Sequence, residues 1–224
     1  MNKSIRNILT DLEHVHENLL SLSDDIWLSI DHNDQEALNE GVAFKKRYNE
    51  KMIAFGKLAS AISSLVQEYT NIQIEEHQVE PWTSPRESRD RFIKDMDKIQ
   101  PHSLDESFTY KRPYGFVLED QGYKEIVTWR RVYELFLKQL AAKSPDTFTA
   151  LCENPDYHSN RGNPTFSQDP LKLRSAMPVT DGIHAESNLS ANSIRDLMKR
   201  LLETFGIPET EVKIYLREDR DAEE

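Results

Sequence analysis

Hydrophobic residues recur every three or four positions over the first seventy residues, a spacing that is typical of helices. Within residues 4–31 the intervals follow a strict heptad, and a second stripe of this kind lies within residues 35–71. A polar segment, residues 31–36, separates the two stripes and is rich in turn-forming residues. Because neither helix can bury its stripe alone, residues 1–72 are predicted to form an antiparallel, coiled-coil-like helical hairpin.

The first stripe is also the predicted oligomer interface. Further apolar residues, among them Leu9, Leu20 and Trp27, widen it beyond a two-helix seam, so this helix should contact more than one neighbour. Two explanations remain open: the hairpin packs on its own C-terminal domain, or it binds a second copy or another protein. In the second case the chain is a homo-oligomer whose interface contains Ile5, Ile8, Leu12, Val15, Leu19, Leu22 and Ile26.

Residues 73–109 have a different character. They are polar, mixed in charge and interrupted by prolines, which predicts a linker. One short helix is expected inside it, beginning with Ser84 as the N-cap and Pro85 at the first helical position.

Strand and helix patterns alternate in residues 110–217. Two apolar runs around a turn at Gly122 predict a β-hairpin, and the turn at Asp181–Gly182 predicts another strand pair. A helix is expected over 129–143, followed by a further helical turn from Ser144 and an exposed loop over 153–170. A second helix is expected from Ser190 to Gly206, and residues 211–216 are expected to form a strand. These elements predict an α+β domain with two helices on one face of a mostly antiparallel sheet, followed by a charged tail, residues 218–224.

The composition excludes several kinds of site. The chain has 224 residues and a net charge of −11, which favours solubility over general attraction to phosphates. Its single cysteine excludes an internal disulfide and a paired-cysteine zinc site, and its seven scattered glycines form no phosphate-binding loop. We therefore expect no cofactor and no metal. No secretory signal and no run of about 18 apolar residues is present, so a cytoplasmic protein without membrane contact is expected.

Two pairs of residues are weak candidates for chemistry. Cys152 and His158 lie close enough in sequence to form a nucleophile pair, although a lone cysteine is more often a small buried hydrophobe. His14 and His16 are two positions apart on a helix, so they point to different faces and are expected to be surface residues.

A metal-dependent nuclease is one alternative function. Glu211 and Lys213 have the spacing of an acidic residue and a lysine on one strand face, as such a site requires. Asp181 is the nearest candidate for the missing acidic ligand.

The basic residues provide the stronger candidate site. Arg195 and Lys199 are four positions apart on the last helix and share a face. Before that helix, Lys172 and Arg174 are expected at alternate positions of a strand, and Arg161 in the long loop. Acidic neighbours on the same helix also fit an ordinary solvated face. Trp129, beside two arginines, could stack a nucleic-acid base or anchor the helix. The candidate residues for binding nucleic acid or a protein partner are Arg195, Lys199, Arg200, Lys172, Arg174 and Arg161.

No catalytic residue is predicted. The pattern favours a non-enzymatic adaptor, of the kind found in prokaryotic multi-protein systems, that self-associates through its N-terminal helices and binds a partner through its α+β domain. A nucleic-acid-binding protein is the first alternative and the nuclease is the second.

Overall fold

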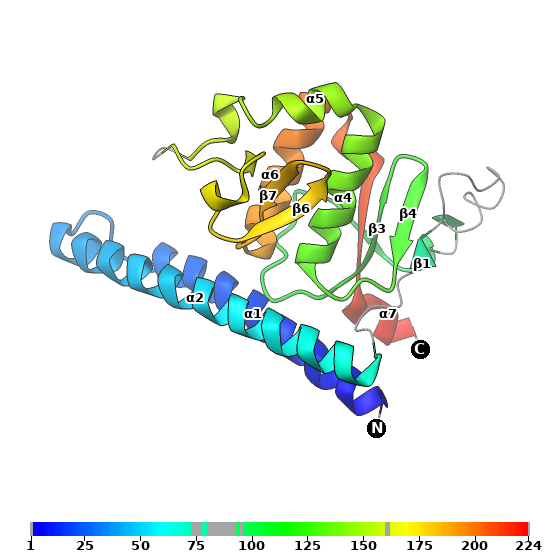
Figure 1. Ribbon diagram of the computed structural model, residues 1–224, viewed down its shortest axis with the longest axis horizontal. Coiled ribbons are helices and arrows are strands. Elements are labelled where there is room, and N and C mark those ends of the chain that lie inside the picture. Colours follow the sequence, from blue (N-terminus) through cyan, green and yellow to red (C-terminus); the bar gives the residue numbers. More distant parts are fainter. Residues whose placement is uncertain (1, 73–77, 80–92, 95, 160–161, 224) are drawn as a thin grey trace. The chain divides into compact units, whose positions relative to one another are not determined.

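The computed structural model describes residues 2–72, 78–79, 93–94, 96–159 and 162–223 (Figure 1). The chain divides into two compact units, Met1–Ile74 and Glu75–Glu224. The first consists of helices and the second combines helices with antiparallel sheets, which confirms the predicted α+β class.

The first unit is a pair of long helices, α1 (Asn2–Leu28) and α2 (Gln35–Thr70), in contact with each other. The Asp34 side chain caps α2 by accepting hydrogen bonds from the backbone N–H groups of Glu36 and Ala37. At the other end Asn71 has a left-handed conformation, with φ of 56°, that stops the helix. The predicted hairpin is therefore confirmed.

Close approach of the two helices depends on small residues and on specific polar contacts. A Cβ added at Gly56 would lie 3.0 Å from the His16 ring, and that ring packs against Phe55 with a centroid distance of 5.8 Å. The Tyr48 hydroxyl donates a hydrogen bond of 2.9 Å to the Leu19 carbonyl. The prediction that His16 is a surface residue is wrong, because its ring fills the space that Gly56 leaves between the helices.

The second unit contains a five-stranded sheet in the order β1-β4-β3-β8-β2, with every neighbouring pair antiparallel. Its strands are β1 (Gln78–Val79), β4 (Gln121–Lys124), β3 (Pro113–Leu118), β8 (Val212–Leu216) and β2 (Pro101–His102). The β3–β4 turn was predicted at Gly122 but lies at Glu119 and Asp120, since Gly122 pairs with Val117. Glu119 provides the positive φ, 55°, that the turn requires.

A second sheet of three antiparallel strands has the order β5-β7-β6. Its strands are β5 (Phe166–Ser167), β7 (Ile183–Glu186) and β6 (Ala176–Thr180). Gly182, with φ of 86°, makes the predicted turn between β6 and β7. Lys172 and Arg174 were predicted on a strand, but Lys172 ends a 3-10 turn, η2 (Pro170–Lys172), and Arg174 lies in the loop before β6. Pro170 and the Asp169 cap favour the turn.

Helix α4 (Trp129–Lys143) packs against β3 of the large sheet, β6 of the small sheet and α6 (Ala191–Phe205) (Figure 1). Nine of its 15 residues are buried, so it is a core helix and not a helix with one apolar face. Trp129 is 1% exposed and its Nε1 donates to the Lys111 carbonyl at 2.7 Å. It is therefore an anchor and offers no surface on which a base could stack.

The short helices α5 (Pro145–Ala150) and α7 (Arg217–Glu223) and the 3-10 turns η1 (Pro155–Tyr157) and η3 (Glu209–Glu211) complete the unit. The segment predicted as a linker contributes to this unit: Leu104 and Phe108 belong to its main hydrophobic core. Met96 and Ile99 pack with Tyr215 in a second cluster. The predicted helix start at Ser84 and Pro85 lies outside the described residues.

Candidate functional site

A cleft of about 620 Å³ opens beside α6 in the second unit. Residues 158–159 and 163–165 form one wall. The rest consists of Lys172 in η2, Arg174 in the loop before β6, Glu186 at the end of β7, Leu189 and residues of α6. Three of the predicted basic residues, Lys172, Arg174 and Arg200, line it together, although they come from three separate parts of the chain. We call this cavity the basic cleft.

Local structure fixes the position of each basic residue. The Asp169 side chain accepts a hydrogen bond of 3.0 Å from the Leu171 N–H, which holds the turn that presents Lys172. The backbone N–H of Arg174 donates to the Glu186 carboxylate at 2.8 Å. Arg200 projects from α6, which begins at the Ser190 N-cap.

Glu186 is the buried acid of the basic cleft. Its side chain is only 6% exposed, and its oxygens accept hydrogen bonds from the backbone N–H groups of Arg174, Ser175 and Asn188, at 2.8, 3.4 and 2.9 Å. The Arg174 guanidinium lies 3.4 Å from the same carboxylate. Glu186 therefore neutralises one of the three basic residues and holds the loop that carries it.

Asp196, the other acid that lines the basic cleft, also has its own cation. Its carboxylate accepts from Arg195 Nε and Nη2 at 2.9 and 2.6 Å. Arg200 donates from Nη1 to the Asp156 carbonyl at 3.1 Å and stacks over the Tyr157 ring, but makes no ion pair with any described carboxylate. Lys172 likewise has no carboxylate partner among the described residues. Two positive charges thus remain uncompensated in the cleft.

The other predicted basic residues of α6 lie elsewhere. Lys199 forms ion pairs with Asp105 and Glu209 at 2.6 and 3.0 Å, and these partners raise its pKa. Arg195 donates to the Glu106 carbonyl at 2.7 Å as well as to Asp196. The predicted basic face of this helix is therefore divided: Arg195 and Lys199 bind acidic or carbonyl groups of the same unit, and Arg200 faces the cleft. Arg161 is outside the described residues.

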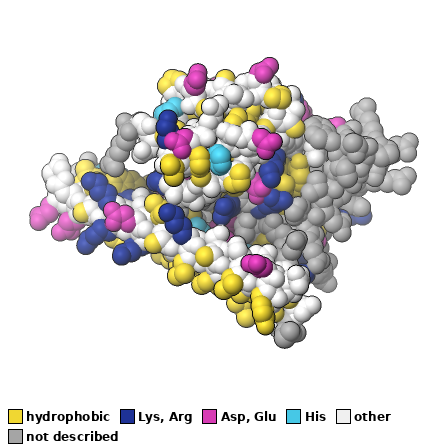
Figure 2. Space-filling model, in the orientation of Figure 1, with side chains coloured by type: hydrophobic (Ala, Val, Ile, Leu, Met, Phe, Trp, Pro, Cys, Tyr) yellow, Lys and Arg dark blue, Asp and Glu magenta, His cyan; other side chains and the backbone are white. Residues whose placement is uncertain are grey.

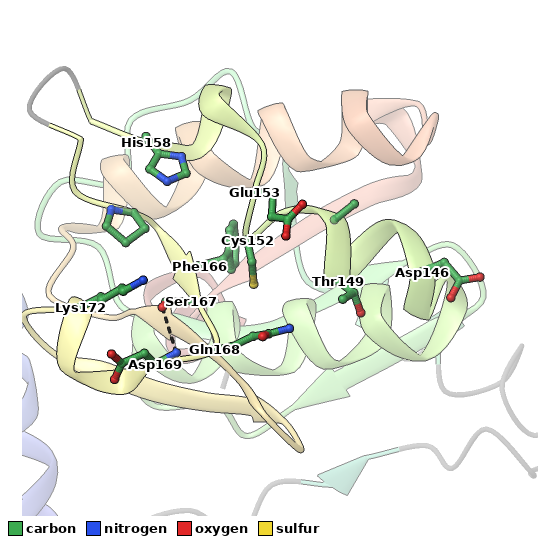
Figure 3. Close-up of a pocket in the computed structure, with 12 residues that line it drawn as sticks. Asp146, Thr149, Cys152, Glu153, His158, Phe166, Ser167, Gln168, Asp169 and Lys172 are labelled. Atoms are coloured by element: carbon green, nitrogen blue, oxygen red, sulfur yellow. Dashed lines mark hydrogen bonds between the residues drawn. The ribbon is translucent and has the colours of Figure 1, made fainter.

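A second cavity, of about 630 Å³, shares Lys172 and His158 with the basic cleft and contains Cys152 (Figure 3). The His158 Nδ1 donates to the Asn154 carbonyl at 3.0 Å, and Figure 3 shows the Cys152 sulfur pointing away from the His158 ring. Burial, together with the charge of Glu153, raises the pKa of the Cys152 thiol. The thiol therefore stays protonated near neutral pH, which argues against a nucleophilic cysteine.

The three residues of the predicted nuclease site, Asp181, Glu211 and Lys213, do not form a common site. Glu211 ends η3, one residue before β8 begins, so it does not share a strand face with Lys213 as predicted. The Lys213 ammonium lies 2.9 and 2.8 Å from the two oxygens of Asp97, and the Tyr215 hydroxyl also donates to Asp97. Asp181 sits at the β6–β7 turn of the other sheet. Among the residues that the structure describes, no three histidine, cysteine or acidic side chains converge as a metal site.

The hairpin carries the other candidate surface. Of the predicted interface residues on α1, three that are seven positions apart are exposed: Ile8 by 66%, Val15 by 47% and Leu22 by 39%. The other four, Ile5, Leu12, Leu19 and Ile26, are half-buried. On α2 a matching stripe is exposed, with Leu58 at 60%, Ile62 at 43%, Leu65 at 66% and Tyr69 at 89%.

Both exposed stripes lie on the same side of the hairpin. At 3.6 residues per turn, the α1 stripe lies about a quarter turn from His16 and the α2 stripe lies between about a third and a half of a turn from Gly56, in the same rotational sense. In an antiparallel pair this displacement brings the two stripes to one side. Figure 2 shows hydrophobic side chains gathered along the hairpin near the end that carries the N-terminus. We call this surface the apolar side; it contains Ile8, Val15, Leu22, Leu58, Ile62, Leu65 and Tyr69.

No protein-family model, curated protein or solved structure matches the chain. Within the part of the chain that the structure describes, no helix is both long and apolar enough to cross a membrane.

Sequence reasoning missed the partners of the basic residues. Asp105 and Glu106, which bind Lys199 and Arg195, lie in the segment predicted as a linker. The position of Glu186 at the end of a predicted strand was a possible signal, because a carboxylate there must be buried and hydrogen-bonded or must turn outward.

Proposed function

We propose that this protein is a non-enzymatic adaptor that self-associates through the apolar side of its hairpin and holds a partner at the basic cleft. The observation that carries the proposal is the exposure of seven large hydrophobic side chains at heptad spacing on one side of the two-helix unit. Contiguous exposed apolar surface of this kind is typical of protein interaction sites.

A second copy of the chain is the proposed occupant of the apolar side. The exposed residues on α2 follow intervals of four, three and four, and those on α1 repeat every seven, which is the spacing that helices need to pack side by side. A two-fold axis across the apolar side would bring the same residues of each copy together, as in most homodimers. The product would be a four-helix assembly with the second units attached to it.

The proposal is tested by placing a charge on the apolar side and measuring mass by sedimentation equilibrium. Leu65→Asp and Ile8→Asp should each convert the assembly to monomer, because a carboxylate in an apolar interface loses its hydration. Ser60→Asp is the matched control: Ser60 is exposed on the same helix but lies on the opposite side. Dissociation by Ser60→Asp to the same extent, or persistence of the assembly in both test variants, would contradict the proposal.

Partner binding is assigned to the second unit because of its charge arrangement. The chain as a whole has a net charge of −11, yet two cations of the basic cleft, Lys172 and Arg200, form no ion pair with any described acid. Both side chains are exposed, and a cleft with an excess of one charge attracts ligands of the opposite charge. This part of the proposal predicts that removing the charge of Lys172 or Arg200 weakens partner binding without changing the mass of the assembly.

A further inference from the structure

We infer that the basic cleft binds a phosphomonoester group. This inference rests on the partner-binding half of the proposed function and names the chemistry of the partner. It is independent of self-association, which depends on residues of the other unit.

The charge of the basic cleft matches this ligand. The acids that line it, Glu186 and Asp196, are satisfied by Arg174 and Arg195, which leaves the charges of Lys172 and Arg200. A phosphomonoester carries between about −1.5 and −2 charges at neutral pH, whereas a carboxylate carries one. Of these two groups, only the phosphomonoester can compensate both Lys172 and Arg200.

The geometry of the donors also favours phosphate. Lys172 supplies a compact ammonium, and Arg200 supplies a guanidinium of which one nitrogen is already held by the Asp156 carbonyl. That contact and the Tyr157 ring fix the orientation of the guanidinium before a ligand arrives. Ser159, Asn163 and Ser193 add hydroxyl and amide groups to the lining. Arginine and lysine with neutral donors are the groups that proteins use most to hold phosphates.

The cleft does not fit an extended single strand of nucleic acid. Such strands bind through aromatic side chains on which successive bases stack. The described lining has no phenylalanine, tyrosine or tryptophan, and the nearby aromatic residues Tyr157 and Phe166 are 2% and 1% exposed. We therefore assign one phosphate group to the cleft, and the test below distinguishes a small molecule from a strand end as its source.

Calorimetric titration of the intact protein tests this inference with four probes: inorganic phosphate, a nucleoside 5′-monophosphate, a 5′-phosphorylated oligonucleotide and the same oligonucleotide without its 5′ phosphate. We expect the monophosphate, the phosphorylated oligonucleotide or both to bind, and the unphosphorylated oligonucleotide to bind at least about tenfold more weakly. Binding only of the phosphorylated oligonucleotide would identify a strand end as the source of the phosphate. Equal binding of both oligonucleotides, or no binding of any probe at about 1 mM, would overturn the inference.

Variants locate the site. Lys172→Gln and Arg200→Gln should each weaken binding of the phosphorylated probe about tenfold, the expected loss for one charge-assisted hydrogen bond. Lys199→Gln is the matched control on the same helix, because Lys199 binds Asp105 and Glu209 away from the cleft, and it should leave the affinity unchanged. Equal losses in all three variants would place binding elsewhere and contradict the inference. Sedimentation of the same variants separates this result from failure of self-association.

Discussion

The Nε2 atom of His102 lies 2.8 Å from the carboxylate of Asp219, so that strand β2 is joined to the C-terminal helix α7. The other ring nitrogen, Nδ1, lies 2.7 Å from the Glu106 carboxylate. Both carboxylates accept hydrogen bonds best from a doubly protonated ring. Burial opposes the charged ring, but the hydrogen bonds to Glu106 and Asp219 outweigh burial and raise the pKa of His102 above 6.5.

This arrangement predicts a pH-dependent contribution to stability. Because the pKa of His102 is higher in the folded protein than in the unfolded chain, the contribution is complete below pH 6.5 and is lost as the pH rises through the folded value. Thermal unfolding of the wild type and His102→Asn should therefore differ more at pH 6 than at pH 9. A difference that grows with pH would have the wrong sign and would reject the pairing with Asp219.

Tyr133 on α4 provides a second prediction, since its hydroxyl is completely buried and has no hydrogen-bond partner among the described residues. Burial raises the pKa of Tyr133 well above its ordinary value. Removing an unsatisfied buried hydroxyl relieves a penalty of about 1–3 kcal/mol, so Tyr133→Phe should leave stability unchanged or increase it. Urea unfolding measures the change. A loss of more than about 1 kcal/mol would mean that the hydroxyl is bonded in solution.

Glu186 should be required for the loop that carries Arg174. Glu186→Ala leaves the N–H groups of Arg174, Ser175 and Asn188 without their acceptor, and we expect a loss of about 3 kcal/mol in the free energy of unfolding. Glu153→Ala, at an exposed position, is the control and should cost less than about 0.5 kcal/mol. Equal stability of the two variants would show that Glu186 does not hold the loop.

Much of the fold could be predicted because local signals mark the ends of the main elements. Thr128 and Ser190 cap α4 and α6 through their side chains, and Gly206, with φ of 64°, ends α6. Capping residues bond to backbone groups only a few positions away in the sequence, so the sequence alone reveals them. The same holds for the turn at Gly182.

The remaining features depend on contacts between distant segments. Strands β2 and β5 have two residues each, too few to show any periodicity, and exist only because β8 and β7 lie beside them. The heptad pattern of α1 identified an apolar stripe but not which of its members stay exposed.

For the same reason, the sequence could predict the basic residues of the cleft but not their arrangement in space. Lys172, Arg174 and Arg200 were identified as candidates from their charge and local positions. Their convergence, and the separation of Lys199 from Arg200, result from the packing of α6 against residues 105–106 and 156–157. No local pattern contains that information.

The mass of the intact chain in solution is the most direct test of the central claim. A single chain has a mass of 26.1 kDa, and self-association through the apolar side predicts at least twice this value in sedimentation equilibrium at about 10 µM or above. The same experiment on Leu65→Asp should return the mass of one chain. A wild-type protein that sediments as a single chain throughout this range would contradict the account.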